Sequence, residues 1–128
     1  MDKVTEIEAK IAASCTPDNN MKDITEILIK AYGDADYPGM WEMHYQGGPI
    51  AYGVREYSYD WYPGSEKKFY NKQAFNWNPT ITGTKSEDTF IYIDGKIEWI
   101  TFKEDSNWPV IKHNINGQII SRPHILIK

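Results

Sequence analysis

The sequence has little that points to catalysis: one cysteine, Cys15, and three histidines among 128 residues. A single thiol cannot close a disulfide within the chain, so a reducing compartment is the simpler expectation. There is no CxxC or HExxH motif, and no glycine-rich loop with the lysine and spacing of a phosphate-binding site. These absences favour a non-enzymatic protein without deciding the point, and we expect no cofactor and no metal.

Long apolar runs are also lacking. None approaches the ~18 residues of a membrane-spanning helix, and the first ten residues carry Asp2, Glu6 and Glu8 without the apolar stretch of a signal peptide. We expect a cytoplasmic protein that contacts no membrane. The net charge of −4 disfavours general nucleic-acid binding, which normally needs a basic face, and is compatible with a basic protein partner.

The first third of the chain has the periodicity of two amphipathic helices within residues 2–33. Val4, Ile7 and Ile11 recur at helical spacing, and a break at 16–20 supplies capping residues for the next segment. The second apolar stripe comprises Met21, Ile24, Ile27, Leu28 and Ala31. Gly33 is a helix stop signal.

From Met40 the apolar period changes to two, which is typical of strands. The pattern predicts strands over 40–46, 50–62 and 67–73, a turn at 47–49 and a long loop over 75–88. Asp94-Gly95 and Asn116-Gly117 each stand between alternating runs, which predicts two tight hairpins.

The sum is an α+β fold in one domain, 1–128. Two helices would pack on one face of a curved, mostly antiparallel sheet of six or seven strands within 40–128. Ile91, Ile93, Ile97 and Trp99 form a stripe that we expect to belong to the core.

Aromatic side chains are unusually frequent, with nine Tyr, five Trp and four Phe. Alternation along 54–62 places Arg55, Tyr57, Tyr59 and Trp61 on one face, and Asp60 with Tyr62 on the other. Tyrosine, tryptophan and arginine are enriched in binding hot spots, so this face is a candidate contact surface or cavity wall. Packing in the core remains the alternative, because sheets often bury tyrosine rings.

Polar residues give two weaker candidates. Glu42 and His44 would share a strand face, and could support acid–base or metal chemistry if His113 or His124 lay nearby. A basic C-terminal segment contains Lys112, His113, Arg122, His124 and Lys128. It would form either a solvated hairpin or a phosphate site.

Three functions remain open. The first is an inhibitor of the antitoxin or immunity type, which blocks a basic partner protein through an acidic, aromatic surface. The second is a small-ligand or nucleotide-binding protein or enzyme with an aromatic cavity, and the third is a structural subunit of an assembly. The oligomeric state is left open. The candidate binding residues are Tyr57, Tyr59, Trp61, Arg55, Glu42, His44 and Asp60.

Overall fold

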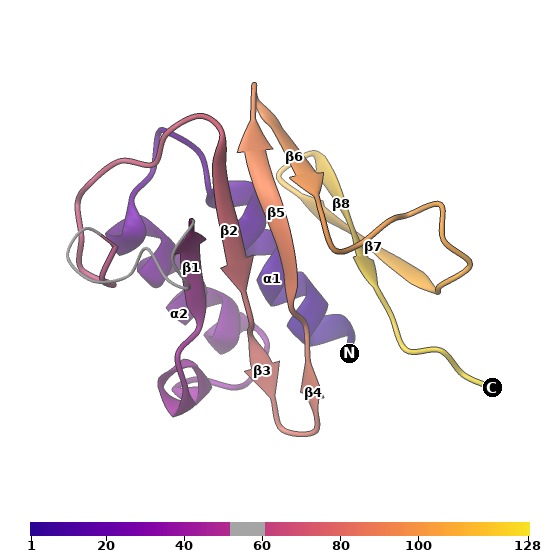
Figure 1. The fold of residues 1–128 in the computed structure, drawn as a ribbon. Coiled ribbons are helices and arrows are strands. Elements are labelled where there is room, and N and C mark those ends of the chain that lie inside the picture. The colour runs from indigo at the N-terminus through magenta and orange to yellow at the C-terminus, as the bar shows by residue number, and fades with distance from the viewer. Residues whose placement is uncertain (52–60) are drawn as a thin grey trace.

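The structure, a computed structural model, describes residues 1–51 and 61–128 (Figure 1). Two helices come first, as the sequence predicted: α1 (Asp2–Ser14) and α2 (Met21–Asp34). A capping box begins α2, because the Asn20 side chain accepts from the Asp23 amide and the Asp23 carboxylate accepts from the Asn20 amide. Within the described ranges, no helix has both the length and the apolar character needed to cross a membrane.

The strands are antiparallel, and those described form three separate sheets. Four strands pair in the order β1 (Gly47–Ile50), β2 (Gln73–Trp77), β5 (Asp88–Ile93) and β6 (Lys96–Trp99). β3 (Thr80–Ile81) pairs with β4 (Thr84–Lys85), and β7 (Val110–Ile115) pairs with β8 (Gln118–Pro123). The α+β class is confirmed, but the single curved sheet is wrong. The β7–β8 hairpin packs against α1 instead of extending the larger sheet.

The two hairpin turns are confirmed. Asp94 and Gly95 have φ angles of 49° and 81°, and Asn116 and Gly117 have 52° and 88°. Two consecutive positive φ angles match the right-handed twist of the flanking strands, which is why this residue chemistry predicts the turn.

Most strand predictions before residue 90 need correction. Residues 40–43 form the 3-10 helix η1 (Met40–Met43) instead of a strand, and the expected turn at 47–49 belongs to β1. Within the 67–73 segment, Lys68 forms an isolated bridge to Asn20 and Gln73 begins β2. The expected loop over 75–88 contains β3, β4 and most of β2. Of the expected strand 50–62, residues 52–60 lie outside the described chain.

Gly47 explains why a turn-like sequence pairs as a strand. Its φ is 107°, and a Cβ at this position would lie 2.7 Å from the Cα of Trp77 on the neighbouring strand. Only glycine allows so close an approach, so β1 and β2 can pair there. The same glycine that suggested a turn is required by the sheet.

An aromatic row runs through the core. Trp61, Phe69, Phe75, Phe90 and Trp99 follow one another with ring centroids 5.5, 5.0, 5.4 and 4.9 Å apart. Such offset and edge-to-face pairs contribute stability beyond their buried area. Much of the aromatic content therefore fills the interior.

The β5–β6 register corrects the expected aliphatic stripe. Phe90 pairs with Trp99, so these two rings share the face that packs on the core. Ile91 stands opposite Glu98 and Ile93 opposite Lys96, which puts both isoleucines on the other face. The expected stripe combined two residues of β5 with two residues of β6 that lie on the opposite face of the sheet. Which residues share a face across two strands depends on their register, which the turn sets.

Arg122 is fully buried and links three elements. Its Nη2 lies 2.8 Å from Glu8 on α1 and 2.5 Å from Asp88 on β5, and its Nε donates to Glu8 as well. Ser86 also donates to Glu8. Burial raises the pKa of the Glu8 carboxyl, and the charge of Arg122 opposes that rise. Arg122 is thus part of the interior and does not belong to a solvated hairpin or an exposed phosphate site.

Candidate binding groove beside η1

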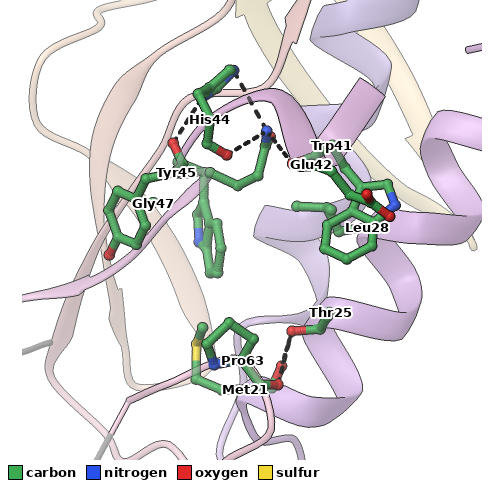
Figure 2. Close-up of a pocket in the computed structure, with 11 residues that line it drawn as sticks. Met21, Thr25, Leu28, Trp41, Glu42, His44, Tyr45, Gly47 and Pro63 are labelled. Carbon is green, nitrogen blue, oxygen red and sulfur yellow. Dashed lines mark hydrogen bonds between the residues drawn. The ribbon is translucent and has the colours of Figure 1, made fainter. Parts of the chain in front are cut away.

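An open groove of about 390 Å³ lies between α2, η1 and the start of β1 (Figure 2). Its floor consists of Met21, Leu28 and Trp77, which are all nearly inaccessible to solvent. Trp41 and Tyr45 add two aromatic side chains to the lining. The volume and the mostly apolar lining are those of a typical ligand or side-chain pocket.

Two local features hold η1 in place as one wall of the groove. The helix begins after Gly39, whose left-handed φ of 82° redirects the chain out of the preceding loop. The buried Gln46 amide then fixes η1: its Nε2 donates to the carbonyl of Trp41 at 2.9 Å, and its Oε1 accepts from the Tyr32 hydroxyl at 2.9 Å. Because Tyr32 is on α2, this amide holds the groove wall against the helix.

The rim carries polar groups, and a large exposed apolar side chain stands between them in the sequence. Glu42 and His44 both line the groove and are exposed. The Nδ1 of His44 lies 2.7 Å from the Tyr45 carbonyl, an arrangement in which Nδ1 holds the proton and donates. Met43 is 76% exposed. An apolar floor, aromatic walls and a single carboxylate therefore converge on one open site.

The structure brings two of the predicted site residues to this groove and separates another from it. Glu42 and His44 meet here as residues of η1 and of the segment that follows it, not as neighbours on a strand. Trp61 is 3% exposed and stacks on Phe69, so it lies in the core, which is the alternative that the sequence left open for this residue. Tyr62, which alternation places on the opposite face from Trp61, is 52% exposed.

Four further candidates, Arg55, Tyr57, Tyr59 and Asp60, lie outside the described residues. Their binding role stays a prediction.

The other two histidines bond to residues in the first turns of α1 and do not line the groove. The Nε2 of His113 is 2.8 Å from the Thr5 hydroxyl, and the Nε2 of His124 is 2.6 Å from the Asp2 carboxylate. The hydrogen bond from His124 lowers the pKa of Asp2. Within residues 1–51 and 61–128, no three metal-ligating side chains come together.

His113 should make stability depend on pH. Burial lowers its pKa; Arg122 and Lys10 add to this, and Glu6 and Asp2 oppose it. The unfolded chain then binds the proton more readily. The contribution of neutral His113 to the free energy of unfolding is complete above the unfolded pKa of about 6.5, and it is lost as pH falls below that value. We expect the free energy of unfolding in urea to drop between about pH 7.5 and 5.5.

The variant His113→Gln should show a smaller drop over this range, and His44→Gln should keep the drop of the wild type, because His44 is exposed. An unchanged slope in His113→Gln would show that this histidine is not the cause.

Sequence reasoning missed part of the groove. Alternation over 40–46 puts Trp41 on the opposite strand face from Glu42, and Gln46, on the same face as Glu42, is not among the predicted site residues. The one local signal for the end of the preceding loop is Gly39, whose left-handed φ comes directly before η1. The contributions of Met21 and Leu28 depend on tertiary packing and have no local signature.

No protein-family model, curated protein or solved structure matches this chain. The chemistry of the groove itself is therefore the basis for a functional conclusion.

Proposed function

We propose that this chain is a non-enzymatic binding protein that holds a basic partner protein at the groove beside η1. One observation carries the proposal: the groove combines an apolar, aromatic lining with a carboxylate, Glu42, at its rim. Interfaces of high affinity use such a combination, in which a buried apolar or aromatic contact supplies binding energy and the charged rim orients the partner.

The exposed side chains next to the groove extend the contact. Met43 is exposed between the lining residues Glu42 and His44, and Tyr62 is exposed next to Pro63, which lines the groove. Methionine adapts to irregular partner surfaces, and tyrosine is enriched in interfaces. A partner covering the groove would remove both side chains from water.

The specific form that we propose is an inhibitor of the immunity or antitoxin type. Such a protein acts by occupying a basic surface of its target. The net charge of −4 supports this form, because an acidic protein is steered toward a basic target at long range.

A small flat ligand is the second candidate. The groove volume of about 390 Å³ falls within the range of small-molecule sites, and Trp41 offers a stacking surface. This candidate predicts an increase in thermal stability with a metabolite or nucleotide, and no dependence on a protein partner.

The variant Met43→Asp should abolish capture of the partner. Met43 is 76% exposed, so the fold tolerates the change, but a carboxylate would have to be buried under the partner. The measurement is an affinity pull-down from source-cell lysate, followed by titration with the purified captured protein. Ile119→Asp is a matched control, because Ile119 is 58% exposed on β8 and lies outside the groove.

A single stoichiometric partner that Ile119→Asp retains and Met43→Asp loses would support the proposal. A partner retained equally by both variants would contradict it. No captured protein, together with a thermal shift from a metabolite, would favour the second candidate.

A further inference from the structure

On the surface, one lysine ammonium group contacts both a carboxylate and an aromatic ring, which belong to two consecutive residues. The Nζ of Lys3 lies 3.0 Å from the Asp36 carboxylate and 5.3 Å from the centre of the Tyr37 ring. A cation over an aromatic face is attracted by the ring quadrupole, and a neighbouring carboxylate adds a charge-assisted hydrogen bond.

The interior uses the same chemistry. The guanidinium carbon of Arg122 lies 3.8 Å from the centre of the Trp99 ring, while Glu8 and Asp88 accept its hydrogen bonds. In both places one cation is bound jointly by an aromatic ring and acidic oxygens. The cation in each case comes from a distant part of the chain.

The groove has the ring and the carboxylate but no cation. Trp41 and Glu42 are adjacent in sequence, as Asp36 and Tyr37 are, and Figure 2 shows both on the same side of the groove. Among the residues that the structure describes, no lysine or arginine lines the groove. Glu42 likewise makes no ion pair with any described basic residue.

We propose that the groove is a subsite for a lysine side chain of the partner, with the ammonium group held by Trp41 and Glu42. This inference rests on the proposed function and specifies its anchor. Charge complementarity selects the ammonium, because the only group in the described lining with a full charge at neutral pH is the Glu42 carboxylate. The four-carbon stem of lysine would lie along the apolar floor that Met21 and Leu28 form.

Lysine fits the groove better than arginine does. The guanidinium of Arg122 is bound by two carboxylates and still leaves its Nη1 without a partner, whereas the described lining of the groove contains one carboxylate. A planar fork with five donors would leave several of them unpaired in the groove. A compact ammonium can rotate its three donors toward Glu42 and solvent.

The test is an NMR titration with N-acetyl-lysine methylamide, following the indole N–H of Trp41. Capped norleucine is the neutral comparison, since it has the same four-carbon stem without the ammonium. We expect saturable shifts with capped lysine and about five-fold weaker binding of capped norleucine, the ratio typical of one exposed cation–π contact. Capped arginine should bind more weakly than capped lysine.

Two variants assign the effect to the carboxylate. Glu42→Gln keeps the shape of the side chain and removes only its charge. The variant should bind capped lysine about five-fold more weakly than the wild type does. Glu26→Gln removes an exposed carboxylate of α2 that does not line the groove, and should change nothing.

Equal binding of norleucine and lysine, no shift with lysine, or an unaffected Glu42→Gln would overturn the inference. The proposed function has a separate test, because capture of a partner that Met43→Asp abolishes would persist even if the anchor were not a lysine.

Discussion

Arg122→Met is expected to lower the free energy of unfolding by about 3–5 kcal/mol. The change leaves the carboxylates of Glu8, which is fully buried, and of Asp88, which is 12% exposed, without their counter-ion. It also removes the cation stacked on Trp99. Urea denaturation followed by circular dichroism measures the loss.

Two comparisons make this prediction specific. Lys112→Met, on the same hairpin as Arg122, removes an exposed ion pair with Glu104 and should cost at most about 1 kcal/mol. The double variant Glu8→Leu/Arg122→Met should cost less than the sum of the single changes, since it removes both buried charges together. Additive costs, or a loss below about 1 kcal/mol for Arg122→Met, would show that the network does not hold α1 to the sheet.

Gly47→Ala is expected to cost about 3 kcal/mol, because a non-glycine residue would have to adopt a φ of 107° and would clash with β2. The new methyl group would meet the backbone of Asn76 and Trp77, which cannot move as a flexible side chain can. Since Gly47 and Trp77 both line the groove, partner binding should weaken together with stability.

Gly33→Ala is the matched control for this prediction. Gly33 lies within α2, and an added Cβ there would have no neighbouring atom within 4 Å. The variant should therefore have a free energy of unfolding about 0.5–1 kcal/mol higher than the wild type. Equal stability of Gly47→Ala and the wild type would show that β1 pairs with β2 less closely than the structure has it.

Local signals predicted the parts of the fold that depend on neighbouring residues. The helices follow from apolar spacing and the Asn20 cap, and the two hairpins from Asp94-Gly95 and Asn116-Gly117. These features need no knowledge of distant residues, because a cap or a two-residue turn is satisfied within a few positions.

Features decided by tertiary contacts could not be predicted from the sequence. Arg122 looked like part of a solvated basic segment, but Glu8, 114 positions away, and Asp88 make its burial favourable. Gly47 looked like a turn residue, although its close approach to β2 makes it a strand residue. A period of two over 40–46 was outweighed by the Gln46 amide, which holds η1 to α2.

The candidate site was predicted in part, for a reason that was itself wrong. Glu42 and His44 were selected as strand neighbours, whereas they lie together because η1 turns the chain beside α2. Trp61 was selected for its aromatic character, which the structure uses in the core row instead. A sequence can show that aromatic rings are abundant, but packing decides which of them meet solvent.

The central claim is that the groove beside η1 binds a basic protein, and calorimetric titration of the captured partner tests it most directly. Wild type is compared with Glu42→Lys in the groove and Ile119→Lys on the outer face of β8. We expect Glu42→Lys to raise the dissociation constant by about ten-fold or more, which corresponds to about 1.4 kcal/mol of lost binding free energy. We expect Ile119→Lys to leave the dissociation constant unchanged. Equal affinities for wild type and Glu42→Lys would contradict the claim.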